Sequence, residues 1–156
     1  ADGVAVDAYW ADDACIDEHG LNTEAHDIAH AYNVSGWTGM YFGGTCFKKQ
    51  REVAPEFYAD AAREACEFMD VVTTSGVATG HEADLSKIET FRDAIGEKPL
   101  ALASGVTPEN AAMYRDVDCF MVATGINEDG NFYDIHPEKL TKLMQVTRAL
   151  GKGALA

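Results

Sequence analysis

The sequence is short of positive charge, of membrane-length apolar runs and of any export signal. Its 156 residues carry 12 Lys and Arg against 26 Asp and Glu, for a net charge of −14. An acidic surface repels phosphate backbones and anionic headgroups, so we expect no nucleic acid and no membrane among its partners. No apolar run reaches the ~18 residues of a membrane span, and no signal peptide is recognisable. These absences predict a cytoplasmic protein.

Cysteine motifs and the common cofactor motifs are also missing. The four cysteines lie far apart, at Cys15, Cys46, Cys66 and Cys119. Without a CxxC pair they fit neither a zinc ribbon nor a small disulfide scaffold. Cys46 lies beside cations, which lower a thiol pKa, and is a candidate reactive thiol. The sequence has no P-loop, dinucleotide fingerprint or nucleophile elbow, and it predicts no cofactor and no metal.

Five short apolar runs alternate with five longer segments of helical pattern. The runs are apolar on both faces, which indicates parallel strands buried beneath helices. The predicted strands are Gly3–Asp7, Gly39–Phe42, Asp70–Thr74, Pro99–Ala103 and Cys119–Ala123. The predicted helices are Thr23–Val34, Pro55–Phe68, Leu85–Ile95, Pro108–Tyr114 and Pro137–Leu150.

The spacing of these units predicts the fold class. Between the first predicted strand start at 3 and the last at 119, the mean spacing is about 29 residues, close to the ~31 per unit of a (β/α)₈ barrel. We therefore expect one α/β domain over residues 1–156, built of parallel (β/α) units. Five strands cannot close a barrel. The chain is either the C-terminal part of a (β/α)₈ barrel or a five-stranded doubly wound sheet, and in the first case self-association or an N-terminal segment should cover the first strand's edge.

Glycine-rich polar turns follow four of the five predicted strands, at the end of the sheet where ligands bind in both architectures. Glycine lets a ligand approach the backbone, and a helix N-terminus offers free N–H donors. One such helix is predicted to begin at Thr107 and Pro108. The turns predict phosphate binding by Ser104, Gly105, Thr124 and Gly125. They predict substrate contacts by Thr74, Ser75, His81 and Asn110.

Charged residues near the strand ends supply the catalytic candidates. Lys48, Lys49 and Arg51 place three cations in four positions after the second strand. We expect Lys48 to face an anionic ligand or a developing negative charge, the alternative being a solvated loop. Asp7, at the end of the first strand, is the candidate general base, the alternative being a turn cap. A solvated loop is expected for the acidic run Asp12, Asp13, Asp17 and Glu18, which lacks calcium-loop spacing.

Three strings carry a resemblance to a known family. They are DVVTTSGVATG at 70–80, LASGVTPEN at 102–110 and DCFMVAT at 118–124, with Ala-Asp-Leu at 83–85 between the first two. In these strings the sequence resembles the BtpA/SgcQ family over residues 39–150. The resemblance implies a phosphate-binding, TIM-barrel-like fold in which this chain supplies strands four to eight. It also implies a link either to photosystem I biogenesis or to sugar or nucleoside metabolism.

Two functions are consistent with these features. The first is an enzyme acting on a phosphorylated sugar or nucleoside-type metabolite, in which Asp7 moves a proton and Lys48 stabilises charge. The second is a non-catalytic assembly or ligand-sensing factor, which keeps the phosphate turns and needs no proton-transfer pair. The first requires Asp7 and Lys48 to share one pocket with the phosphate turns. In both, Gly105→Val is expected to abolish phosphate binding while the fold survives.

Overall fold

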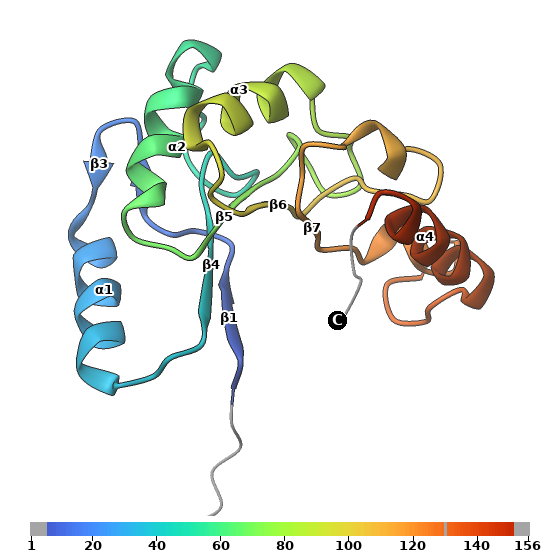
Figure 1. Cartoon of the computed structure of the whole chain (residues 1–156), viewed down its shortest axis with the longest axis horizontal. Helices are drawn as coiled ribbons and strands as arrows, with labels where there is room; N and C mark the ends of the chain where they lie inside the picture. The colour runs from blue at the N-terminus through green and yellow to red at the C-terminus, as the bar shows by residue number, and fades with distance from the viewer. Residues whose placement is uncertain (1–5, 130, 152–156) are drawn as a thin grey trace, which may run out of the picture.

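Five parallel strands form the sheet around which the chain is arranged (Figure 1). The computed structural model describes residues 6–129 and 131–151. The strands are β1 (Ala8–Ala11), β4 (Met40–Gly44), β5 (Val71–Thr74), β6 (Leu100–Leu102) and β7 (Cys119–Phe120), and they lie side by side in that order. All the pairings are parallel, so the predicted α/β class of parallel (β/α) units is confirmed.

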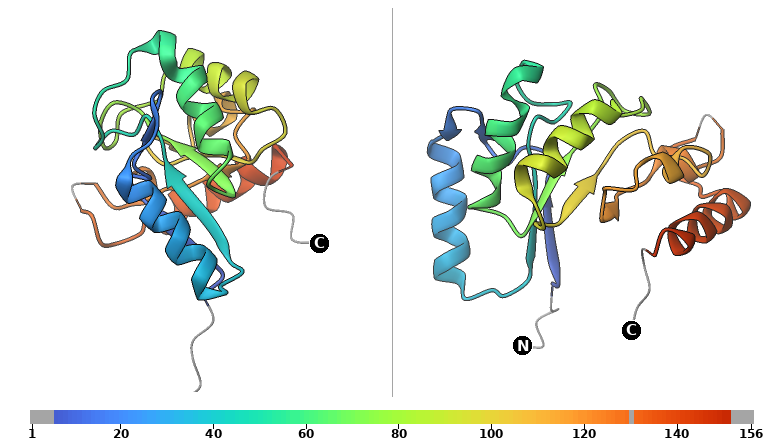
Figure 2. Two further views of the ribbon diagram at one scale, coloured as in Figure 1. Left: turned by 90° about the vertical axis from the view of Figure 1, so that its left-hand side faces the viewer. Right: turned by 45° about the horizontal axis from the view of Figure 1, so that its top comes forward.

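The helices decide between the two predicted architectures. They are α1 (Thr23–Ser35), α2 (Tyr58–Cys66), α3 (Leu85–Ile95) and α4 (Pro137–Ala149). Figure 2 shows α1, α2 and α3 along one side of the sheet, which curls from β1 towards β7. In a doubly wound sheet the strand order changes direction at a switch point within the sheet, and helices cover both faces. The sequential order and the one-sided helices therefore make the fold a partial (β/α) barrel.

The core lies between the sheet and these helices. From the sheet it contains Val72, Leu100 and Leu102, and from α3 it contains Ile88 and Phe91, all buried to 2% exposure or less. Asp84 caps α3 by accepting a hydrogen bond from the Ser86 N–H. This packing holds the βα loops in register at the carboxyl ends of the strands.

The first strand differs from its prediction. Gly3–Asp7 was expected, but β1 begins at Ala8, and residues 3–5 lie outside the described residues. Aromatic contacts account for the register, since Tyr9 stacks on Tyr41 and Trp10 packs edge-on against Phe47. Asp7 therefore precedes the first strand instead of ending it.

The predicted helix Pro108–Tyr114 is also wrong. Only a short 3₁₀ turn, Ala111–Met113, forms there. The Asn110 side chain accepts a hydrogen bond from the Thr107 N–H and donates one to the Gly105 carbonyl, which holds the segment as a compact turn. The short elements that the sequence did not predict are β2 (Ile16–Asp17), β3 (Gly20–Leu21) and the 3₁₀ turn Thr124–Ile126. The predicted helix Pro55–Phe68 forms as a 3₁₀ turn, Pro55–Phe57, followed by α2.

None of the described helices is long and apolar enough to cross a membrane.

Candidate functional site

The loops after β4, β5, β6 and β7 enclose a small cavity of about 70 Å³. A cavity of this size holds a few water molecules or a small anion. Residues that the sequence singled out line it from three of these loops. They are Lys48, Ser104, Gly105, Thr124 and Gly125.

Lys48 is the cation of this cavity. Its backbone N–H donates to Ser75 Oγ at 2.9 Å, and its ammonium lies 5.3 Å from the centre of the Phe47 ring. Among the residues that the structure describes, no carboxylate lies within ion-pair distance of Lys48. Lys49, one position later, is paired with Asp12 at 2.6 Å. The geometry thus leaves Lys48 available to an anion, and its role there stays a prediction.

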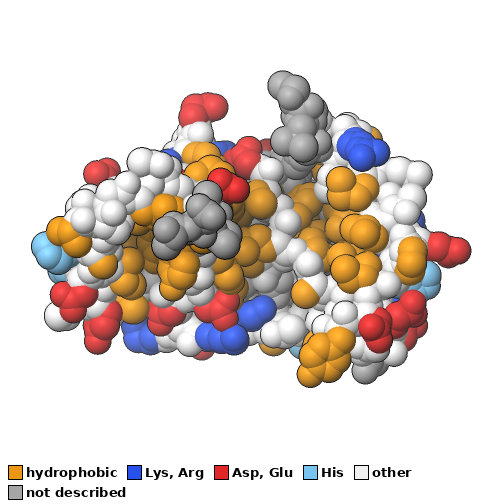
Figure 3. Space-filling model, turned by 90° about the horizontal axis from the view of Figure 1, so that it is seen from below, with side chains coloured by type: hydrophobic (Ala, Val, Ile, Leu, Met, Phe, Trp, Pro, Cys, Tyr) orange, Lys and Arg blue, Asp and Glu red, His pale blue; other side chains and the backbone are white. Residues whose placement is uncertain are grey.

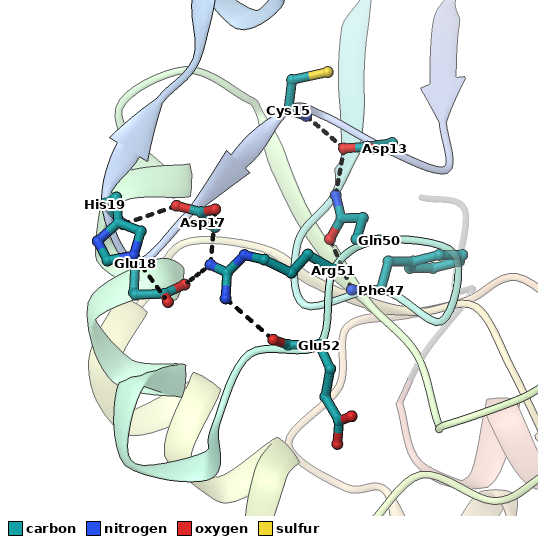
Figure 4. Close-up of polar contacts among 9 residues, drawn as sticks. All are labelled: Asp13, Cys15, Asp17, Glu18, His19, Phe47, Gln50, Arg51 and Glu52. Atoms are coloured by element: carbon teal, nitrogen blue, oxygen red, sulfur yellow. Dashed lines mark hydrogen bonds and ion pairs between the residues drawn. The ribbon is translucent and has the colours of Figure 1, made fainter.

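Arg51 organises the acidic run that the sequence analysis assigned to a solvated loop (Figure 4). Its guanidinium donates to Asp17 at 2.9 Å and to Glu18 at 2.6 Å. The hydrogen bond from Arg51 lowers the pKa of Glu18 from its usual value. Much of the acidic run is therefore paired with the basic loop at the surface, a constraint that the expectation of a solvated loop did not include. No cluster of metal-ligating side chains is found in the described part of the chain.

Gln50 anchors the loop that carries Lys48 (Figure 4). Its amide nitrogen donates to Asp13 Oδ1 at 2.6 Å and to the Gly44 carbonyl at 2.7 Å. Its amide oxygen accepts the Phe47 N–H at 2.8 Å. These three bonds fix the backbone next to Lys48.

Close packing of loops, not room for a ligand, explains the glycines of the cavity. Gly105 has φ +68°, and a Cβ there would lie 2.0 Å from the His81 carbonyl oxygen. A Cβ on Gly125 would lie 2.0 Å from the Val106 carbonyl oxygen. These contacts require glycine at both positions without any ligand, so phosphate binding by the two glycines stays a prediction. A larger residue at Gly105 would push apart the two turns, so Gly105→Val is expected to disturb the fold as well as the cavity.

The predicted helix N-terminus does not supply donors either, because no α-helix begins at Thr107 and Pro108. Thr107 Oγ1 accepts the N–H groups of Glu109 and Asn110 at 3.2 and 3.3 Å. Backbone donors remain elsewhere on the cavity lining. Within the described chain, the N–H groups of Gly105, Thr124 and Gly125 form no hydrogen bond.

The four predicted substrate residues do not line the cavity. Asn110 is buried, and its amide bonds the backbone of its own loop and donates to Glu82, in the loop after β5, at 3.0 Å. Thr74 and Ser75 are fully buried, and Ser75 Oγ donates to the Gly76 carbonyl. His81 is exposed, although the neighbouring Thr79 and Gly80 line the cavity. These side chains shape the loops, and the prediction of direct contact has no geometric support.

Asp7 lies at the opposite end of the sheet. It is exposed, and its carbonyl accepts the Met40 N–H at 2.9 Å, at the amino ends of β1 and β4. The cavity lies beyond the carboxyl ends of the strands. The structure therefore does not bring Asp7 and Lys48 together, because the first strand begins after Asp7.

Lys87 is a candidate that sequence reasoning missed. This α3 residue is 9% exposed, and Nζ donates to the carbonyls of Cys46 at 2.6 Å and Ser75 at 2.9 Å. Burial lowers the pKa of Lys87 to about 8. The signal was present in the sequence, because Lys87 stands four residues before Phe91 on the apolar face of α3.

Cys46 is not the reactive thiol that the sequence suggested. Its side chain is buried, and burial raises the pKa of the thiol to about 11. The cations beside it in sequence do not offset this desolvation. Near neutral pH, Cys46 is a protonated side chain that packs in the core.

The sequence matches no protein-family model, and the curated proteins give no match. Among solved structures, phosphoribosyl anthranilate isomerase from Thermus thermophilus is similar, with a TM-score of 0.47 and 17% sequence identity. The alignment covers 83% of this chain and 82% of that one. A similarity this distant carries no argument about the site.

Proposed function

We propose that this chain binds a small phosphorylated metabolite, of the sugar or nucleoside type, with the phosphate in the cavity after β4, β6 and β7. One observation carries the proposal. Lys48, a lysine with no carboxylate partner in the described chain, lines this cavity with Ser104, Gly105 and Thr124 from two other strand ends. In a chain of net charge −14, an unneutralised cation at a polar cavity favours an anionic ligand locally, within the ~8 Å over which salt leaves the interaction unscreened.

The cavity is large enough for the phosphate group but not for the whole ligand. Its 70 Å³ suits a compact anion, with Lys48 acting as a point charge on the phosphate oxygens. The N–H groups of Gly105 and Thr124 are further donors on the same lining. The sugar or nucleoside part would then lie outside the cavity, over the loops.

The resemblance to the BtpA/SgcQ family supports an enzyme of phosphosugar or nucleoside-type metabolism. A second candidate is a non-catalytic assembly or ligand-sensing factor, with a role like that in photosystem I biogenesis. The placement of Asp7 at the amino end of the sheet favours this second candidate, because it leaves the cavity without the expected general base. Both candidates need the same phosphate site.

Thermal melts with matched ligands and matched lysine variants test the proposal. Ribose 5-phosphate and AMP are compared with ribose and adenosine, on the wild type, on Lys48→Met and on Lys49→Met. A ligand at 100 times its Kd adds about 2.7 kcal/mol, which raises Tm by roughly 5 °C in a domain of this size. We expect that shift with a phosphorylated ligand only, its loss in Lys48→Met and its retention in Lys49→Met.

Equal shifts in the two lysine variants, or none with any phosphorylated ligand, would contradict the phosphate site. Product analysis after incubation with the stabilising ligand then separates the two candidates. Turnover supports the enzyme, and binding without turnover supports the sensing factor.

A further inference from the structure

Lys87 is a buried lysine that has no carboxylate partner among the described residues. Its Nζ donates to the carbonyl oxygens of Cys46 and Ser75. It also lies within cation–π distance of the Tyr58 and Phe91 rings, which favour the charged form. Burial has the opposite effect and lowers the pKa of the amine to about 8, so near this pH part of the population carries a neutral, nucleophilic amine.

This amine borders a second and larger cavity of about 320 Å³. Lys87 and Tyr58 line it together, with Nζ 5.0 Å from the centre of the Tyr58 ring. Lys48 and Arg51 line it too, and Glu52 contributes one carboxylate. Arg51 is already paired with Asp17 and Glu18, so Lys48 is the cation of this lining that has no carboxylate partner among the described residues.

We propose that Lys87 is a covalent binding site, at which its amine forms an imine with a small carbonyl compound that carries an anionic group. The cavity accommodates such a molecule, and Lys48, which has no carboxylate partner in the described chain, supplies the positive charge for its anionic group. The lowered pKa of Lys87 provides a neutral fraction near pH 8. The inference goes beyond the proposed phosphate site and does not depend on it.

The chemistry needs no co-reactant. The nitrogen lone pair attacks the carbonyl carbon, the C=O π pair moves to oxygen, and a proton passes from nitrogen to that oxygen to give a carbinolamine. The nitrogen lone pair then forms C=N while the hydroxyl leaves as water after protonation, and the remaining N–H proton is released. One amine and one carbonyl become one imine and one water.

Reductive trapping on the wild-type chain tests this directly. The chain is incubated at pH 8 with glycolaldehyde phosphate and sodium cyanoborohydride, and the modified lysines are mapped by peptide mass spectrometry. We expect Lys87 to be alkylated at least tenfold faster than the exposed Lys49. Modification of Lys87 no faster than Lys49, or none at all, overturns the proposal.

A second arm isolates the anionic group. Glycolaldehyde without phosphate is expected to label Lys87 at least fivefold more slowly than glycolaldehyde phosphate does, and equal rates overturn the anionic part of the proposal. Lys87→Arg keeps donors for the two carbonyls and cannot form the imine, so the fast labelling should disappear from the protein. Since the mapping is carried out on the wild type, a variant that fails to fold does not change the labelling result.

The labelling test of Lys87 and the melting test of the phosphate site can fail independently of each other. Fast Lys87 labelling without a melt shift from ribose 5-phosphate or AMP overturns the proposed function alone. A melt shift that needs Lys48, with Lys87 unlabelled, overturns the imine alone.

Discussion

The ammonium of Lys49 lies 2.6 Å from Asp12, whereas Lys48 lines the cavity without a carboxylate partner in the described chain. The sequence singled out Lys48 for an anionic ligand and assigned no partner to Lys49. Their difference arises because the loop is anchored by Gln50, whose side chain bonds Asp13 and the Gly44 carbonyl. The role of each lysine is thus set by bonds that the other residues of the loop make.

Lys87 makes the stability of the fold depend on pH. Burial lowers its pKa from 10.5 to about 8. Below pH 8 both the folded and the unfolded chain bind the proton, so the cost of burying the charge is fully present. Between pH 8 and 10.5 the unfolded chain binds more protons, and the free energy of unfolding rises with pH. The difference between the two pKa values corresponds to a gain of about 3 kcal/mol at most in the free energy of unfolding.

The measurement is urea unfolding of the wild type and Lys87→Met from pH 7.5 to 10.5. Cys46 and Tyr58 face Lys87, and burial raises the pKa of both, Cys46 to about 11. Above about pH 9 the raised pKa values of these two acids lower the free energy of unfolding as pH rises, which opposes the effect of Lys87. The quantity to compare is therefore the difference in free energy of unfolding between the wild type and the variant. We expect the wild type to gain up to about 3 kcal/mol relative to the variant across this range. A constant difference would show that Lys87 keeps an ordinary pKa.

At the scale of the elements, the turn after β6 is held by its contact with the turn after β5. Ser104 Oγ donates to the Ala78 carbonyl at 2.9 Å. Gly105 packs directly on the His81 carbonyl. The shape of the cavity therefore depends on the packing of these two loops. The strands β6 and β7 are short, so their backbone hydrogen bonds contribute little to holding the loops in place.

Gly105→Ala tests this loop contact, with Gly36→Ala as its control. Both glycines have φ near +67°, but a Cβ on Gly36 meets nothing within 4 Å, while one on Gly105 lies 2.0 Å from the His81 oxygen. The control carries only the backbone cost, about 1 kcal/mol. We expect Gly105→Ala to cost about 3 kcal/mol or more, measured by chemical unfolding. Equal costs would mean that the loops separate freely.

At the scale of the whole molecule, the open sheet has two edge strands, β1 and β7, of which β1 is the longer. Among the described residues, β1 pairs with β4 on one side and with no strand on the other. Tyr9 of β1 and Met40 of β4 are about half exposed. Figure 3 shows apolar side chains gathered on the face opposite α2 and α3, towards α1 and towards α4. An unpaired edge beside exposed apolar groups favours association with another strand.

We propose that the chain self-associates through β1. Multi-angle light scattering should give a mass above the 16.8 kDa of the chain. Tyr9→Lys is expected to shift the mass towards the monomer, because a charged side chain on an edge strand opposes pairing. Val34→Lys, at an exposed position of α1, serves as the control and should leave the mass unchanged. A monodisperse wild-type monomer would contradict the proposal.

The sequence by itself determined the repeat of strands and helices, the α/β class and the ends of α3. These are local properties, since apolar patterning, the Asp84 cap and Gly96 act within a few residues of one another. The tertiary structure alone decided that β1 begins at Ala8, because that register depends on Tyr41 and Phe47, more than thirty residues away. It also decided that Asp7 lies at the amino end of the sheet and that Lys87 donates to two loop carbonyls. Contacts between segments that are distant in the sequence position the residues of the site, and local sequence patterns do not predict such contacts.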